Sequence, residues 1–346
     1  MGNIWWEDIQ SSKRFINDIV KGMKDDGNSV VLHIPDGLPW IEGFRRLVVN
    51  GLKEDSERMV KVIDHTPSDI GKYMLENYCR KEKRFKYRPR SNFNEASFLG
   101  QDETSTLKTC YVIIHNASDK EEAAWLRFIE EYYRSCQGVR RGIFLIESSA
   151  PSGNNGTRGV QHLFYIDYIA QQDIHAYTSM CIGEESVSRI YRSYLSELLS
   201  QVSSSDLEIL DDLLWKWEDV LERPLETFMN AGLSLSEEEL RKRIWKAQIR
   251  VVFPEIEEFR CYIVSKYRQA WETFLPWKTD YTIIDNVENL ELSFLLYMAK
   301  NRSIMDERDY RYTQVFVEAR NELAHLGILD FKHVEAILGR ESQKTI

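Results

Sequence analysis

The sequence predicts an α/β domain with a parallel sheet, followed by an all-helical domain. Up to residue 183, short apolar runs rich in β-branched residues alternate with amphipathic segments of helical period. This alternation is typical of a parallel sheet covered by helices on both faces. From residue 184 onward, helical periodicity dominates. The 346 residues, 43% of them apolar, suffice for two or three domains with packed cores.

In the first half, four short runs rich in apolar residues are expected to form strands, the first of them a buried one because it is apolar and β-branched. They span residues 29–34, 59–63, 110–115 and 142–146. Helices are predicted over 4–24, from 41 through 48, and over 70–84 and 121–136, with a mobile surface loop between residues 90 and 108.

In the second half, apolar spacing predicts helices over 187–202, 206–221, 236–249, 255–274, 286–300, 309–325 and 333–338. Only residues 249–253 resemble a strand there. We therefore expect an α/β domain over 1–183, a helical linker or lid-like region over 184–236 and a helical domain over 237–346.

Charge and cysteine content exclude several classes of protein. A net charge of −10 argues against a uniformly basic binder of duplex DNA. The five cysteines lie at least 26 residues apart, so no zinc knuckle is expected, and reduced thiols suit a cytoplasmic protein. No apolar run of 18 residues occurs, so we expect no membrane span. We expect no metal and no cofactor, and interpret His33 and His115, which end apolar strands, as buried or rim histidines.

Residues 30–48 have the layout strand, tight loop, helix, which is the layout of a phosphate-binding P-loop. When GxxGxGK[ST] is laid over the loop, Trp40 takes the Lys position and Ile41 the Ser/Thr position. The first half thus resembles a degenerate form of the AAA+ and STAND families of P-loop ATPases. The resemblance makes Pro35, Asp36, Gly37 and Trp40 the remnant of a nucleotide loop, with Trp40 crowding the phosphate position.

The second landmark of those ATPases is also altered. The strand 110–115 leads into His115-Asn116-Ala117-Ser118 instead of an acidic pair, and Asp119 is expected to cap the next helix. Ser148 and Ser149 follow the strand 142–146, where those families place a polar sensor. Two interpretations stay open: a site that binds nucleotide without hydrolysing it, or a fold retained as a scaffold or protein-binding module.

A basic and aromatic segment spans residues 80–90 and carries a local charge of +6. Aromatic residues alternate here with lysines and arginines. This arrangement suits RNA binding, because aromatic rings stack on bases while cations contact phosphates. A docking loop for an acidic protein and a plain exposed loop are the alternatives. The candidate nucleic-acid-binding residues are Arg80, Lys81, Lys83, Arg84, Phe85, Lys86, Tyr87, Arg88 and Arg90.

The predicted helix 309–325 has two distinct faces at 100° per residue. Its apolar side comprises Val315, Phe316, Ala319, Leu323 and Leu326. Asn321 and His325 lie on the opposite side, Arg320 lies at the edge of that exposed arc, and Gly327 is expected to end the helix.

Arg-Asn-x-x-x-His on a late helix is the motif of the HEPN superfamily, which this chain resembles over residues 237–341. Segments 254–271 and 290–301 resemble the helices that precede the motif helix in that superfamily. The resemblance implies a homodimer and metal-independent RNA cleavage. Arg320 would neutralise the scissile phosphate, His325 would transfer protons and Asn321 would orient either group. Alternatively, Arg320 pairs with Glu318 or another carboxylate, and Asn321 and His325 bond to each other as a cap.

Three functions remain open. The first is a prokaryotic defence effector, in which an ATPase-derived, nucleotide-inactive sensor half controls a HEPN ribonuclease, with RNA and partner proteins of the same system as its partners. The second is a non-enzymatic scaffold and dimerisation protein in a larger complex. The third is a nucleotide-binding switch without hydrolysis.

Overall fold

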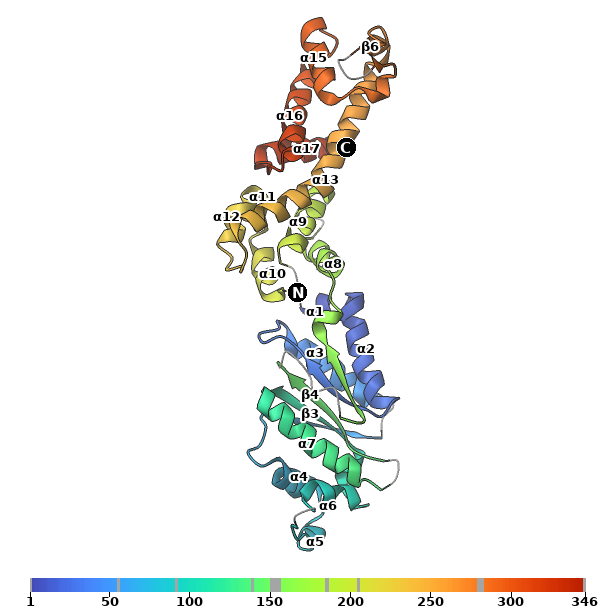
Figure 1. The fold of residues 1–346 in the computed structure, drawn as a ribbon, viewed down its shortest axis with the longest axis vertical. Helices are drawn as coiled ribbons and strands as arrows, with labels where there is room; N and C mark the ends of the chain where they lie inside the picture. Colours follow the sequence, from blue (N-terminus) through green and yellow to red (C-terminus); the bar gives the residue numbers. More distant parts are fainter. Residues whose placement is uncertain are drawn as a thin grey trace. The chain divides into compact units, whose positions relative to one another are not determined.

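In the computed structural model the chain forms two compact units, Met1–Ala170 and Gln171–Ile346 (Figure 1). The structure describes residues 2–54, 57–90, 93–137, 140–149, 157–183, 187–203, 206–278 and 283–344. The division falls between residues 170 and 171, because helix α8 (Gln171–Cys181) packs on α9 (Arg189–Val202). The expected boundary at 183/184 adjoins residues 184–186, which lie outside the described residues.

The first unit is built on a five-stranded sheet in which every strand pairing is parallel. The strands are β1 (Ser29–His33), β2 (Met59–Ile63), β3 (Cys110–Ala117), β4 (Ile143–Ser148) and β5 (Val160–Phe164). Their order across the sheet is β2-β3-β4-β1-β5. The four predicted strands and the parallel sheet are confirmed. Strand β5 was not predicted, because it is an edge strand with the mixed sequence VQHLF.

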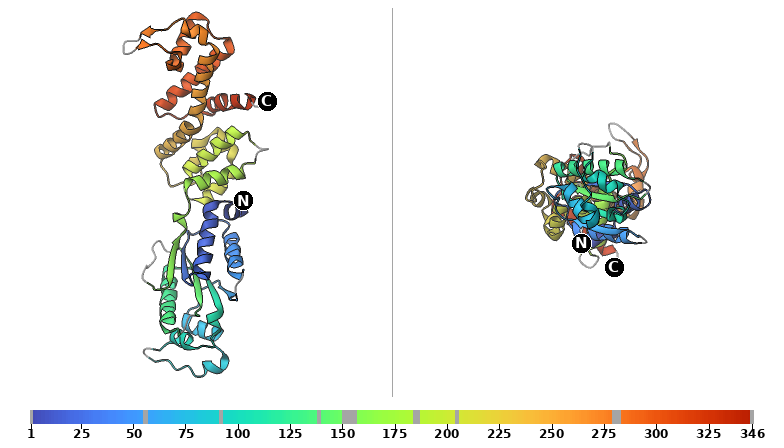
Figure 2. Two further views of the ribbon diagram at one scale, coloured as in Figure 1. Left: turned by 90° about the vertical axis from the view of Figure 1, so that its right-hand side faces the viewer. Right: turned by 90° about the horizontal axis from the view of Figure 1, so that it is seen from below.

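Helices cover both faces of this sheet (Figure 2, left). One face carries α1 (Gly2–Glu7), α2 (Gln10–Lys24) and α3 (Ile41–Lys53). The other carries α4 (Ile70–Tyr78), α6 (Glu95–Gln101) and α7 (Asp119–Ser135). On the α7 face, Val31, Ile114 and Ile146 of the central strands pack against Trp125 and Ile129. Burial of this apolar layer is the main stabilising term of the unit.

Several predicted elements of the first unit need correction. The helix expected over 4–24 is broken at Asp8–Ile9, and the helix over 70–84 ends at Tyr78, before the short α5 (Lys81–Arg84). The expected loop up to residue 108 contains α6, whose first turn is capped by Asn94 Oδ1 accepting from Ser97 N at 3.0 Å, and a 3₁₀ turn at Thr106–Thr109. Residues 91–92 of that loop lie outside the described residues.

The second unit is helical, as predicted, apart from a short hairpin. Its other helices are α10 (Leu207–Trp215), α11 (Trp217–Glu222), α12 (Pro224–Met229), α13 (Glu237–Lys266), α14 (Arg268–Glu272), α15 (Leu292–Arg302), α16 (Glu307–Ala324) and α17 (Phe331–Lys344). The hairpin pairs β6 (Trp277–Lys278) with β7 (Ile283–Ile284). No helix within the described ranges is long and apolar enough to cross a bilayer.

The strand expected at 249–253 is wrong, because α13 runs unbroken through it. Pro254 has no N–H to donate to the carbonyl one helical turn before it. Pro254 is exposed, so this carbonyl can be hydrated instead. Buried Val252, Ile256 and Phe259 continue one apolar stripe across the proline. Because this stripe packs against neighbouring helices, tertiary contacts override the local signal for a break.

Candidate functional site

The end of α16 carries the three motif residues of the helical unit. Phe316, Ala319 and Leu323 are fully buried, and α16 packs against α13, α15 and α17. Asn321 and His325 are exposed on the outer side of the helix, and Arg320 is half-buried at its edge. Helix periodicity therefore brings a guanidinium, an amide and an imidazole to one solvent-facing end of a firmly packed helix.

Arg320 pairs with Glu291, the residue that precedes α15, and its side chain is 28% exposed. Within the described chain the side chains of Asn321 and His325 form no hydrogen bond or ion pair, so they do not cap each other. The two residues are joined only through the backbone, where His325 N donates to Asn321 O at 3.1 Å. Both side chains are thus available for a ligand.

The helix ends one residue earlier than expected. Leu326 adopts the left-handed conformation with φ +62°, Leu326 N donates to Leu323 O at 3.2 Å, and Gly327 N donates to Glu322 O at 2.9 Å. This is a Schellman motif with a leucine in the position that favours glycine. Leu326, expected on the buried side, is 71% exposed. A large apolar side chain in a strained backbone conformation therefore adjoins the three motif residues.

Two side chains of α13 hold this helix end in place. Trp245 Nε1 donates to the Leu323 carbonyl at 2.8 Å, and so gives this carbonyl a second donor beside Leu326 N. Gln248 is fully buried, donates through Nε2 to Leu329 O at 3.0 Å, and accepts from Leu329 N at 2.8 Å. No local pattern in the sequence points to either residue, because each acts across about 80 positions of the chain.

In the α/β unit, a hollow of about 260 Å³ lies at the carboxyl edge of the sheet. Its lining comes from the β1–α3 loop and the ends of β3 and β4: Ile34, Pro35, Asp36, Gly37, Leu38, Ile41, Asn116, Ala117, Ser118, Glu147, Ser148 and Ser149. Trp40 is not among these residues, so it does not crowd the hollow as expected. Its backbone is left-handed with φ +58°, and its carbonyl accepts from Trp6 Nε1.

Glu147 is a buried carboxylate in the lining of this hollow, and no motif in the sequence points to it. Its side chain is 2% exposed, and its Oε2 receives Arg45 Nη2 at 2.7 Å and Nε at 3.0 Å. Arg45 also donates to Asn116 Oδ1 at 3.0 Å, and His115 Nε2 lies 3.6 Å from Glu147 Oε1. Because the Arg45 guanidinium is held by the buried Glu147 carboxylate, the hollow offers little attraction to phosphates. The cap of α7 is Ser118 rather than Asp119, in a capping box with Glu121.

The basic segment is divided between structural and exposed side chains. Lys83 pairs with Asp102, and Arg84 Nε donates to Cys79 O at 3.1 Å. Tyr87 packs on Phe98 with ring centroids 5.3 Å apart, and burial raises its pKa to about 12. The remaining candidates are exposed: Arg80, Lys81, Phe85, Lys86, Arg88 and Arg90. Phe85, at 79% exposure, is the ring best placed to stack on a base.

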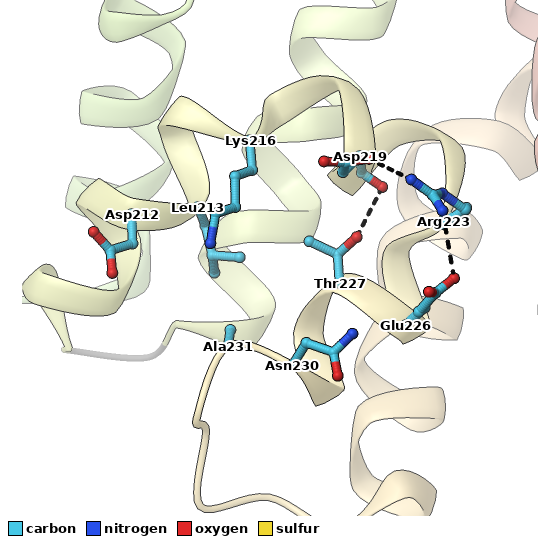
Figure 3. A pocket seen from close by; sticks show the side chains of 9 residues that line it. All are labelled: Asp212, Leu213, Lys216, Asp219, Arg223, Glu226, Thr227, Asn230 and Ala231. Atoms are coloured by element: carbon cyan, nitrogen blue, oxygen red, sulfur yellow. Dashed lines mark hydrogen bonds and ion pairs between the residues drawn. The ribbon is translucent and has the colours of Figure 1, made fainter.

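A second hollow, of about 330 Å³, lies between α10, α11 and α12 (Figure 3). Arg223 on its wall pairs with Asp219 at 2.6 Å and Glu226 at 3.8 Å, and Thr227 Oγ1 donates to the Asp219 carbonyl. These charges satisfy one another, and the lining holds no nucleophile with an adjacent base. We assign no chemistry to it.

Comparisons with known proteins identify no relative. No protein-family model matches the chain. No curated protein and no solved structure is significantly similar to it.

Proposed function

We propose that the helical unit is a HEPN-like, metal-independent endoribonuclease with Arg320, Asn321 and His325 as its catalytic residues. The observation that carries the proposal is the exposed cluster of these side chains at the fixed end of α16. The α/β unit is then a degenerate P-loop scaffold that serves as a sensor in a prokaryotic defence system. The parallel sheet, and a carboxyl-edge hollow whose described lining has no lysine or arginine, support that part.

The chemistry uses the 2′-hydroxyl of RNA as the nucleophile. The 2′-oxygen forms a bond to phosphorus while the bond from phosphorus to the 5′-oxygen breaks. The proton of the 2′-hydroxyl passes to a neutral imidazole, and the leaving 5′-oxygen receives a proton from an imidazolium. Arg320 stabilises the charge that builds on the phosphate oxygens. The products are a 2′,3′-cyclic phosphate and a 5′-hydroxyl.

One helical unit provides one His325, whereas the reaction uses both a base and an acid. Two copies that pair through the exposed end of α16 supply both, together with two Arg320 side chains. The exposed Leu326 beside the motif gives such a pairing an apolar contact. A strictly monomeric mass at tens of micromolar protein would contradict this arrangement.

A non-enzymatic scaffold is the second candidate. The ion pair between Arg320 and Glu291 favours it, because a guanidinium already held by a carboxylate has a weaker claim on a phosphate. In the enzyme, RNA has to displace Glu291, or Glu291 has to orient Arg320 toward the phosphate.

The test compares wild-type protein with Arg320→Ala and His325→Ala on total RNA in the presence of EDTA. We expect His325→Ala to abolish cleavage and Arg320→Ala to slow it about 10²–10³-fold, as for the loss of one transition-state charge contact. Arg311→Ala is the matched control, because Arg311 lies on the same helix and its ion pair among the described residues is with Glu307 one turn away. A DNA copy should stay intact, since it has no 2′-hydroxyl. Equal cleavage by wild type and both variants would refute the assignment.

A further inference from the structure

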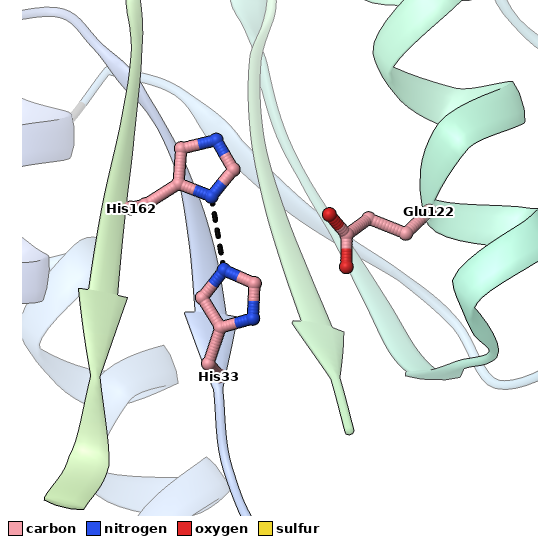
Figure 4. Close-up of side chains that lie close together, drawn as sticks. All are labelled: His33, Glu122 and His162. Atoms are coloured by element: carbon pink, nitrogen blue, oxygen red, sulfur yellow. Dashed lines mark hydrogen bonds between the residues drawn. The ribbon is translucent and has the colours of Figure 1, made fainter. Parts of the chain in front are cut away.

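Two histidines from neighbouring strands meet on the α7 face of the sheet (Figure 4). In the parallel register of β1 and β5, His162 lies opposite Val31, two residues before His33. Side chains two residues apart on a strand share a face, so both imidazoles point to the side that packs on α7. His33 Nε2 and His162 Nδ1 are 2.9 Å apart.

Glu122, in the first turns of α7, completes the cluster from the helix side. One ligand atom from each of His33, Glu122 and His162 lies within 4.8 Å of the other two (Figure 4). Ser148 lies on β4, opposite His33 of β1 in the parallel register. Its hydroxyl donates to Glu122 Oε2 at 2.5 Å. The hydroxyl thereby orients the carboxylate toward the histidines.

The cluster is buried, and burial is most costly for its carboxylate. Glu122 is 4% exposed, and none of the described residues forms an ion pair with it. His162 Nε2 is likewise buried, with no hydrogen-bond partner in the described chain. Burial, followed by the neighbouring His33, lowers the pKa of His162. A buried carboxylate is costly unless a cation offsets it.

We propose that His33, His162 and Glu122 bind a divalent transition-metal ion, with Zn²⁺ as the best-fitting class. Two imidazoles and one carboxylate form a common ligand set for Zn²⁺, with a water or another donor in the fourth position. Tetrahedral ligands at about 2.0–2.1 Å from zinc lie about 3.3 Å apart. On binding, His33 Nε2 and His162 Nδ1 therefore separate by a few tenths of an ångström, and the Glu122 carboxylate moves inward while it keeps its hydrogen bond to Ser148.

The surroundings are those of a prepared ligand set. The His33 ring stacks on Phe164 with centroids 4.2 Å apart and planes at 11°, which fixes the plane of one ligand. The Ser148 hydroxyl fixes the carboxylate, as outer-shell partners of metal ligands do. The bound ion would tie the edge strand β5 to β1 and α7. This site lies in the α/β unit and is independent of the proposed ribonuclease site, which needs no metal.

Binding is tested with Zn²⁺ alone. The full-length protein is stripped with a chelator, titrated with Zn²⁺ by calorimetry, and its metal content is measured by elemental analysis. The variants are His33→Gln, His162→Gln and Glu122→Gln. The control is His65→Gln, an exposed histidine of the same unit. We expect one ion per chain, at least a tenfold weaker affinity in each ligand variant, and wild-type affinity in the control.

Two further measurements keep the result interpretable if a variant is destabilised. Zn²⁺ should raise the melting temperature of wild type and of His65→Gln, and should leave that of His162→Gln unchanged. Co²⁺ should give the visible spectrum of a tetrahedral site when it is added to wild type. It should not give this spectrum with any of the three ligand variants. Absence of stoichiometric binding to wild type, or unchanged affinity in both His162→Gln and Glu122→Gln, overturns the proposal. RNA cleavage by His162→Gln is measured as well and should persist, because the proposed ribonuclease site lies in the other unit. The metal proposal and the ribonuclease proposal can therefore fail independently of each other.

Discussion

Replacing Gln248 with Leu should loosen the segment that follows His325. Leucine keeps the apolar bulk but removes three hydrogen bonds: two to the backbone of Leu329 and one from Nε2 to the Tyr194 hydroxyl at 3.0 Å. Each such bond contributes about 0.5–1.5 kcal/mol net, and a buried group left unpaired costs more. Leu329 is 4% exposed, so water cannot replace the lost partner. We expect the helical unit to lose about 2–4 kcal/mol of unfolding free energy.

Urea denaturation followed by Trp fluorescence measures this loss, and hydrogen exchange locates it. The amide protons of residues 326–334 should exchange faster, because the clamp on the Leu329 backbone is gone. The control is Gln201→Leu, since Gln201 is half-buried and its side chain bonds, among the described residues, to Glu197 one turn away, while its backbone contact with Arg243 survives the substitution. A loss below about 1 kcal/mol in Gln248→Leu, or an equal loss in both variants, would refute the clamp.

Three other outcomes follow from particular residues. Leu326→Gly should stabilise the helical unit by about 0.5–1 kcal/mol in the same urea assay, because glycine adopts φ +62° without strain while losing some backbone entropy. The Asp309 backbone N–H, and then Lys266, lower the pKa of Asp306 to about 2. Ionised Asp306 therefore stabilises the start of α16 above about pH 4, and this stabilisation should be lost as the pH falls toward 2 and the carboxylate becomes protonated. Hydrogen exchange of the α16 amides, measured as a function of pH, follows the loss. Calorimetry with ATP and Mg²⁺ should detect no micromolar binding, because Glu147 holds the nearby Arg45 and the described lining of the carboxyl-edge hollow includes no lysine or arginine.

The strands and most helices could be predicted because their signals are local. Runs such as 110–115 are mostly apolar and carry consecutive β-branched residues at their centre, as is typical of buried parallel strands. Helix α16 could be predicted to its first and last turns, since its apolar residues recur at helical spacing. The exposure of Asn321 and His325 follows from the same periodicity.

The failures arise where distant contacts decide the outcome. Pro254 signals a break, yet α13 continues because buried side chains on both sides of the proline pack on neighbouring helices. Leu326, rather than Gly327, takes the left-handed position, although the sequence favours glycine there. Backbone contacts such as Trp245 to Leu323 fix where the helix ends, and no local pattern reports them.

The two candidate sites differ in how far their residues can be predicted from local sequence. Arg320, Asn321 and His325 fall within six consecutive residues, so helix geometry alone brings them to one end of α16. His33, Glu122 and His162 span 130 residues, and their meeting depends on strand order and on the register that sets Val31 opposite His162. A shift of that register by one residue would turn His162 to the opposite face. The histidine that ends β1 therefore looked like an isolated rim residue in the sequence, and only the pairing of β1 with β5 makes it part of a ligand set.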